Sequence, residues 1–220
     1  MELRFDGRRD AEFRPPTVEP GHVPGAKGSV FYEVGDTVVI AAVHLDPRAD
    51  SKTESPAIVL TLSPVVERPF AFESPLRSLL QALAACALDS RVKPTTLVLS
   101  VHVLLGDGSV APAVLNAALL ALMDAGIPLR TLPISLELAL CRTARPDTIC
   151  VDPTLQEEAS GPTALILLTM DALEPDRVHG LLTQQAIHPT ELSEALELSK
   201  TIVAEQLRRF RARLCGEETR

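Results

Sequence analysis

The stretch GDGSVAPAVLNAALLALMDAGIPLR, residues 106–130, decides the fold of this chain. It follows residues 95–105, in which apolar residues alternate as in a strand, and it bends at Asp107-Gly108. Residues 112–125 then have the composition of a helix that is apolar on almost every side. Because only Asn116 interrupts the apolar surface of that helix before its last turn, we expect it to be covered on both sides, at the centre of the molecule.

The rest of the chain mixes strands with isolated helices. Residues 28–45 predict a β-hairpin with its turn at Gly35-Asp36. Ser74-Pro75 predicts the start of a helix, with the serine as N-cap and the proline in the first turn. Further strands are expected at residues 57–66, 132–140, 148–151 and 164–170, and a long amphipathic helix at residues 190–214. This order favours an α+β fold over a strict βαβ repeat.

Composition narrows the class of protein. With 220 residues, 46% hydrophobic and 23% charged, the chain is long enough to bury the core of a single globular domain. The formal net charge of −8 excludes a basic field over the whole molecule, so any contact with nucleic acid must be local. The expected organisation is an N-terminal arm at 1–27, one domain at 28–215 and a tail at 216–220, with neither a secretory signal nor a membrane span. The four cysteines are widely spaced and predict reduced thiols in an intracellular protein.

Familiar site signatures are missing. The segment GHVPGAKGS, residues 21–29, lacks the spacing and the preceding strand of a nucleotide phosphate loop. The five histidines have no paired spacing, so they predict no metal site. Only the acidic run at residues 152–158 places paired carboxylates directly after a strand, and such runs are more often solvated turns. We therefore expect no cofactor and no metal.

Several short motifs, taken together, resemble the RNase PH family. They are Asp6-Gly7-Arg8-Arg9, Gly35-Asp36-Thr37, Asn116-Ala117-Ala118, the segment from Asp124 to Pro128, and the acidic run that ends in Glu157-Glu158. The resemblance covers almost the whole chain. It implies an RNase PH-like fold, also described as ribosomal protein S5 domain 2-like, in which mixed sheets pack with helices in a single domain. In that family the turn before the central helix supplies groups that hold inorganic phosphate.

At the positions that would carry the chemistry, the chain departs from the family pattern. Val110 and Ala111 stand where the family has threonine and arginine, and Gln81 stands at a second arginine. Glu158 matches a metal-site aspartate, but Ala164 or a neighbour occupies the place of the second carboxylate. A neutral amide brings no charge to a phosphate dianion, and hard cations want several oxygen ligands. The resemblance therefore implies a relative without catalysis, and no catalytic residue is assigned.

Within the family, the chain is most similar to the core ring subunits of the eukaryotic RNA exosome. That resemblance implies a structural role in a hexameric ring of RNase PH-like subunits that supports 3′-to-5′ RNA processing and degradation, including that of rRNA. It also implies localisation in the nucleus, including the nucleolus, and in the cytoplasm. An isolated chain is expected to self-associate, because surfaces meant for neighbouring subunits would be exposed.

Two alternatives remain open at this point. One is an active 3′-to-5′ exoribonuclease, either phosphate-dependent or Mg²⁺-dependent through Glu157 and Glu158. The other is a stand-alone RNA-binding protein that uses Arg68, Arg77 and the basic segment at residues 208–213. Arg68 and Arg77 are also the candidate RNA contacts of a ring subunit.

Overall fold

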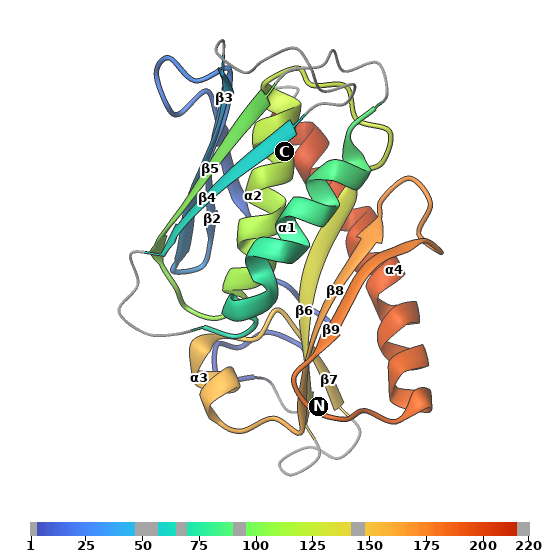
Figure 1. The fold of residues 1–220 in the computed structure, drawn as a ribbon. Helices are drawn as coiled ribbons and strands as arrows, with labels where there is room; N and C mark the ends of the chain where they lie inside the picture. Colours follow the sequence, from blue (N-terminus) through green and yellow to red (C-terminus); the bar gives the residue numbers. More distant parts are fainter. Residues whose placement is uncertain (1–3, 47–56, 65–69, 90–95, 142–147, 215–220) are drawn as a thin grey trace.

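The computed structural model describes residues 4–46, 57–64, 70–89, 96–141 and 148–214. Two sheets and two helices between them form most of the molecule (Figure 1). The elements in chain order are β1 Thr17–Pro20, β2 Gly28–Val34, β3 Thr37–Asp46, β4 Ala57–Pro64, α1 Glu73–Ala87, β5 Thr96–Leu105, α2 Val110–Asp124, β6 Pro133–Cys141, β7 Thr148–Val151, α3 Leu155–Ala159, β8 Ala164–Asp171, β9 Val178–Thr183 and α4 Pro189–Leu214. The expected α+β fold is confirmed.

The first sheet has the strand order β1-β2-β3-β5-β4, and the second has the order β7-β6-β8-β9. All neighbouring strands are antiparallel except β4 and β5, which run parallel because α1 carries the chain back between them. In the predicted hairpin, β2 pairs with β3 from Gly28 opposite Val43 to Val34 opposite Thr37. Apart from Tyr32 and Ala41, the apolar side chains of β2, β3 and β5 in the core are valine or leucine, which suits a half-buried sheet.

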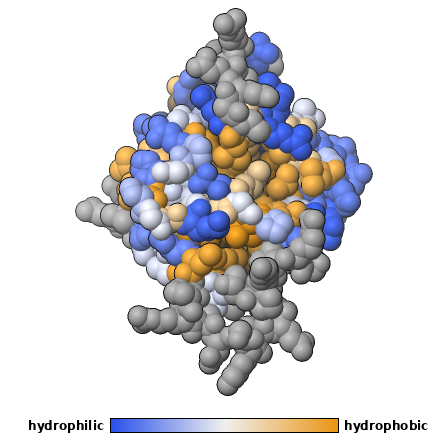
Figure 2. Space-filling model, turned by 90° about the horizontal axis from the view of Figure 1, so that it is seen from above, coloured by the Kyte–Doolittle hydropathy of each residue, from blue (hydrophilic) through white to orange (hydrophobic). Residues whose placement is uncertain are grey.

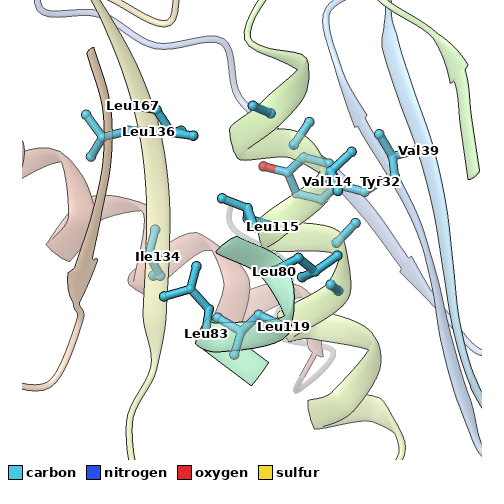
Figure 3. Packing of buried hydrophobic residues seen from close by; sticks show 14 of the residues in the cluster. Tyr32, Val39, Leu80, Leu83, Val114, Leu115, Leu119, Ile134, Leu136 and Leu167 are labelled. Carbon is cyan, nitrogen blue, oxygen red and sulfur yellow. The ribbon is translucent and has the colours of Figure 1, made fainter. Parts of the chain in front are cut away.

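The helix α2 lies at the centre of the molecule, as its sequence predicts. Every residue from Val110 to Leu122 is buried, and the helix packs against β2 and β3 on one side and β6 on the other. Figure 3 shows Leu115 and Leu119 among Leu80 and Leu83 of α1 and Ile134 of β6. This layer joins the two sheets through one continuous apolar core.

The predicted starts of the first two helices are each wrong by two residues. The helix α1 begins at Glu73, with Phe72 rather than Ser74 as its N-cap, and α2 begins at Val110 rather than Pro112. In both helices the proline is the third residue of the helix. Proline is tolerated there because the backbone N–H groups of the first turn have no partner inside the helix.

The structure also contains elements that the sequence did not predict. Residues 17–20 of the expected arm form β1, which extends the first sheet by pairing with β2. The exposed strand β9 extends the second sheet at its edge. The short helix α3 lies within the acidic run, between β7 and β8.

Part of the surface is apolar. Viewed from above, hydrophobic residues gather in the middle of one face and hydrophilic residues surround them (Figure 2). Exposed large apolar side chains in the described residues include Leu105, Leu173 and Val59, each at least half exposed. Apolar patches of this kind are typical of surfaces that contact another protein. No helix in the described part of the chain is long and apolar enough to span a bilayer.

Candidate anion site at the start of α2

The turn at residues 106–109 is fixed by contacts from two directions. Thr37 on β3 accepts a hydrogen bond from the Asp107 N–H (2.8 Å) and donates one to the Gly108 carbonyl (2.9 Å). Gly108 has a φ of +76°, and a Cβ atom there would lie 2.3 Å from the Pro153 carbonyl oxygen. Only glycine therefore allows this turn to approach the segment that follows β7.

Arg14 ties the turn to Asp152. Its guanidinium donates to both carboxylate oxygens of Asp152 (2.7 and 2.8 Å) and to the carboxylate of Asp107 (3.1 Å). Asp152 also accepts the Arg14 backbone N–H at 2.9 Å. Arg14 and Asp152 are both buried, so this is a charge pair that is hydrogen-bonded on several sides. The N-terminal arm is thereby fastened over the start of α2.

A second ion pair fixes the acidic run itself. Arg4 pairs with the Glu157 carboxylate and donates to the Val151 carbonyl at 2.7 Å. Thr154 and Glu157 form a reciprocal capping box at the start of α3. The hydrogen bonds from Arg4 and Thr154 hold the pKa of Glu157 below its usual value against the opposing effect of burial. The carboxylate of Glu157 is thus already bound by groups of its own chain.

The neighbouring carboxylate, Glu158, lies at the amino end of α2. The Ser109 backbone N–H donates to Glu158 Oε1 at 2.7 Å. Ser109 is the N-cap of α2, with a φ of 48°, and its hydroxyl donates to the Pro153 carbonyl rather than to the helix. A negative charge at the amino end of a helix is favoured by the helix dipole. Glu158 therefore takes the place of an anion at this helix end.

The protonation of Glu158 is poised near neutrality. Burial raises the pKa of the Glu158 carboxyl group to about 7, and the nearby carboxylates of Asp107 and Asp152 add to the rise. The hydrogen bond from the Ser109 N–H and the charge of Arg14 act in the opposite direction.

A third carboxyl group near the turn, that of Glu137, was not predicted from the sequence. It lies on β6 and is 1% exposed, and neither of its oxygens has a hydrogen-bond partner among the described residues. Burial raises its pKa well above the usual value, and the charges of Glu158 and Asp152 raise it further. The single charged residue in the strand sequence PISLELALC, which is otherwise apolar except for Ser135, was a signal that could have indicated it.

The four positions singled out by sequence do not form one open site. Glu158 contacts the turn before α2, but Val110 and Ala111 are buried in the first turn of that helix. Ala111 has no exposed surface at all. Gln81, in contrast, is exposed on α1.

Of the two candidate RNA contacts, Arg68 and Arg77, the structure describes only Arg77. Arg68 lies outside the described residues. Arg77 is exposed on α1, and its guanidinium donates to the Leu60 carbonyl on β4 at 2.8 Å. In the basic segment at the end of α4, Arg208 and Arg209 both pair with Glu205. Among the described residues, no group of three or more His, Cys, Asp or Glu side chains is arranged to hold a metal ion.

The chain is similar in sequence and fold to known proteins. Residues 12–128, more than half of the chain, match domain 1 of the 3′ exoribonuclease family, RNase PH. The exosome complex component RRP41 homologue of Arabidopsis thaliana is 36% identical over 60% of this chain and 61% of its own length. The exosome complex exonuclease RRP46 homologue of Oryza sativa subsp. japonica is 30% identical over 71% of this chain and 66% of its own length. The chain thus spans slightly less than two thirds of each of these relatives.

The fold agrees over a longer stretch than the sequence. The crystal structure of rice (Oryza sativa) Rrp46 superimposes with a TM-score of 0.86, covering 96% of this chain and 100% of that one at 23% identity. The strand, turn and helix around Asp107-Gly108 lie within residues 12–128, the part of the chain that matches the family. The chain accordingly belongs to the 3′ exoribonuclease (RNase PH) family.

Proposed function

We propose that this chain is a non-catalytic structural subunit of an RNA exosome ring. In this role it occupies one position among RNase PH-like neighbours and supports 3′-to-5′ RNA processing and degradation. The relatives named exosome complex component RRP41 homologue and exosome complex exonuclease RRP46 homologue, together with the family match, support the assembly. We infer the lack of catalysis from the residues at the start of α2.

The contact between Ser109 and Glu158 carries the proposal. Phosphorolysis needs a phosphate dianion beside the bond that breaks, together with cations or donors that offset its charge. Here the carboxyl group of Glu158 lies at the amino end of α2, where it occupies the Ser109 N–H and in its ionised form would repel a phosphate. The first two side chains of α2, Val110 and Ala111, are buried and carry neither a hydroxyl nor a charge. Each missing charge-assisted contact removes about 2–4 kcal/mol of transition-state stabilisation.

The alternative of Mg²⁺-dependent hydrolysis through Glu157 and Glu158 is disfavoured by the same geometry. Magnesium requires oxygen ligands that can face the ion in an octahedral arrangement. The Glu157 carboxylate is bound by Arg4 and by Thr154 in the capping box, and Glu158 is bound by the Ser109 N–H. Recruiting them to a metal would break contacts that hold the arm and α3.

The exposed surfaces fit a protein that works in an assembly. The strands β4 and β9 are sheet edges, and exposed apolar side chains such as Val59 on β4 and Leu181 on β9 lie along them. We expect these faces to contact neighbouring subunits and the isolated chain to self-associate through them. RNA contacts are assigned to Arg77 and Arg68, and the complex to the nucleus, including the nucleolus, and the cytoplasm.

The first experiment asks which proteins accompany the chain. Tagged chain is purified from cell extract, and its partners are identified by mass spectrometry. Recovery of other RNase PH-like subunits in equal amounts supports the ring. Recovery of the chain alone, together with RNA binding by the monomer that weakens with salt, would favour a stand-alone RNA-binding protein.

The second experiment asks about catalysis. The purified chain is incubated with a 3′-tailed RNA, with and without inorganic phosphate and Mg²⁺. We expect no shortening under any condition. Phosphate-dependent shortening would overturn the non-catalytic assignment. Mg²⁺-dependent shortening that disappears in the Glu157→Gln/Glu158→Gln double variant would establish the hydrolytic alternative.

A further inference from the structure

A small cavity lies where α2, β6 and α4 meet the N-terminal arm. Its volume is about 20 Å³. Polar side chains from several elements line it: Arg14, Tyr32, Ser109, Asn116, Ser135, Glu137, Asp152 and Gln206. These residues belong to elements that are distant in the sequence, so the cavity lies at a junction of the fold.

Two side chains bring unpartnered oxygens to this cavity. Both carboxyl oxygens of Glu137 on β6 and the side-chain oxygen of Gln206 on α4 are buried without a hydrogen-bond partner among the described residues. Glu137 is 1% exposed and Gln206 is 7% exposed. Buried polar atoms in native proteins are nearly always hydrogen-bonded to protein or to ordered water.

The polar side chains of Asn116 and Ser135, which also line the cavity, already have hydrogen-bond partners. The Asn116 side chain exchanges two hydrogen bonds with the Ser135 backbone, at 2.9 and 2.8 Å. The Ser135 hydroxyl is paired with Thr169 at 2.8 Å. The groups that remain to be satisfied are therefore those of Glu137 and Gln206, on opposite elements.

The size of the cavity limits what can fill it. A water molecule needs a cavity of roughly 10–15 Å³ and two to four polar partners, so this space takes one water and little more. We propose that one ordered water molecule occupies the cavity and bridges the carboxyl group of Glu137 on β6 to the side-chain oxygen of Gln206 on α4. The water links α4 to the second sheet.

The charges around the cavity fit a water rather than a cation. The charges of Glu158 on α3, Asp152 after β7 and Arg14 on the arm act on Glu137. Arg14 and Asp152 also line the cavity. Burial and the two carboxylates raise the pKa of Glu137 well above its usual value, which favours its neutral form. The O–H of a neutral carboxyl group donates a hydrogen bond to the water, and the water donates a hydrogen bond to the side-chain oxygen of Gln206. A hard cation would instead need an ionised Glu137 and several more oxygens.

A crystal structure of the full chain at high resolution tests the proposal directly. We expect density for one water within hydrogen-bonding distance of both Glu137 and Gln206, and no anomalous peak there after a rubidium soak. An empty cavity, a water that contacts only one of the two residues, or a rubidium peak would each overturn the proposal.

A thermodynamic cycle supplies a readout in solution. Unfolding equilibrium constants are compared for Gln206→Leu, Glu137→Leu and the double variant, with Glu137→Gln as the conservative control. If one water joins the two side chains, the two Leu substitutions are coupled. The change in the unfolding equilibrium constant of the double variant then differs by at least about twofold from the product of the two single changes. Strictly multiplicative effects would contradict a bridge. If the Leu variants do not fold, the crystal structure of the unaltered chain still decides the question.

Discussion

The Ser109 backbone N–H donates to Glu158 Oε1 at 2.7 Å, and this contact joins the first residue before α2 to the short helix α3. The two residues come from segments separated by two strands, β6 and β7. The contact places a carboxylate at the amino end of the central helix, and it makes the stability of the turn depend on the protonation of Glu158.

The first prediction concerns pH. The pKa of Glu158 is raised to about 7 in the folded chain, above the value of about 4.3 expected in the unfolded chain. The folded state therefore binds more protons between these two values, so stability falls as pH rises from about 4.3 to 7 and levels off above. Glu158→Gln should flatten this slope. Urea unfolding at several pH values from 5 to 8 measures how the unfolding free energy changes with pH. The same pH dependence in the unaltered chain and in Glu158→Gln would contradict the prediction.

Much of the fold follows from sequence patterns, because burial imposes a period on the chain. The alternation of β5, the hairpin pattern of β2 and β3 and the apolar sequence of α2 correspond to faces that the structure buries. The elements that were missed are β1 and β9, which lie at sheet edges with mostly exposed or half-buried residues, and α3, which is short. Of these, α3 carried a local signal in the capping box of Thr154 and Glu157.

The candidate site was less accessible to sequence reasoning. The family resemblance singled out Gln81, Val110, Ala111 and Glu158, but it gave no indication that a carboxylate would contact the Ser109 N–H. That contact forms because α3 packs against the turn before α2. The secondary-structure propensities of the two segments do not indicate that they lie side by side. The division into an arm at 1–27, a domain at 28–215 and a tail at 216–220 stays a prediction, although β1 shows that part of the arm pairs with the sheet.

The second prediction concerns Gly108. Alanine there would place Cβ 2.3 Å from the Pro153 carbonyl oxygen, at a φ of +76°. Gly126 is a matched control, because its φ is +66° but its Cβ would meet no atom within 4 Å. Gly126→Ala should lose about 1–2 kcal/mol of unfolding free energy from backbone strain alone. Gly108→Ala should lose clearly more, as measured by urea unfolding, and equal losses would mean that the turn is not packed against Pro153.

The third prediction concerns the clamp between Arg14 and Asp152. Arg14→Met leaves the buried Asp152 carboxylate with Arg8 as its only paired cation among the described residues, at 3.2 Å, and should lower the unfolding free energy by up to about 3–5 kcal/mol. Arg213→Met, at an exposed position near the end of α4, removes the same charge and should leave stability nearly unchanged. Both are compared by urea unfolding at neutral pH. Similar small losses would show that the arm is not held by this ion pair.

The last prediction asks whether the start of α2 can be made into a phosphate site. Ala111 has no exposed surface, so Ala111→Arg forces a charged side chain into the core and should unfold the chain or destabilise it strongly. Gln81→Arg adds the same charge at an exposed position on α1 and should be tolerated. Thermal unfolding with and without inorganic phosphate compares them. A stable Ala111→Arg variant whose melting temperature rises with phosphate would show that the amino end of α2 is open to anions, and would contradict the assignment of Glu158 as its occupant.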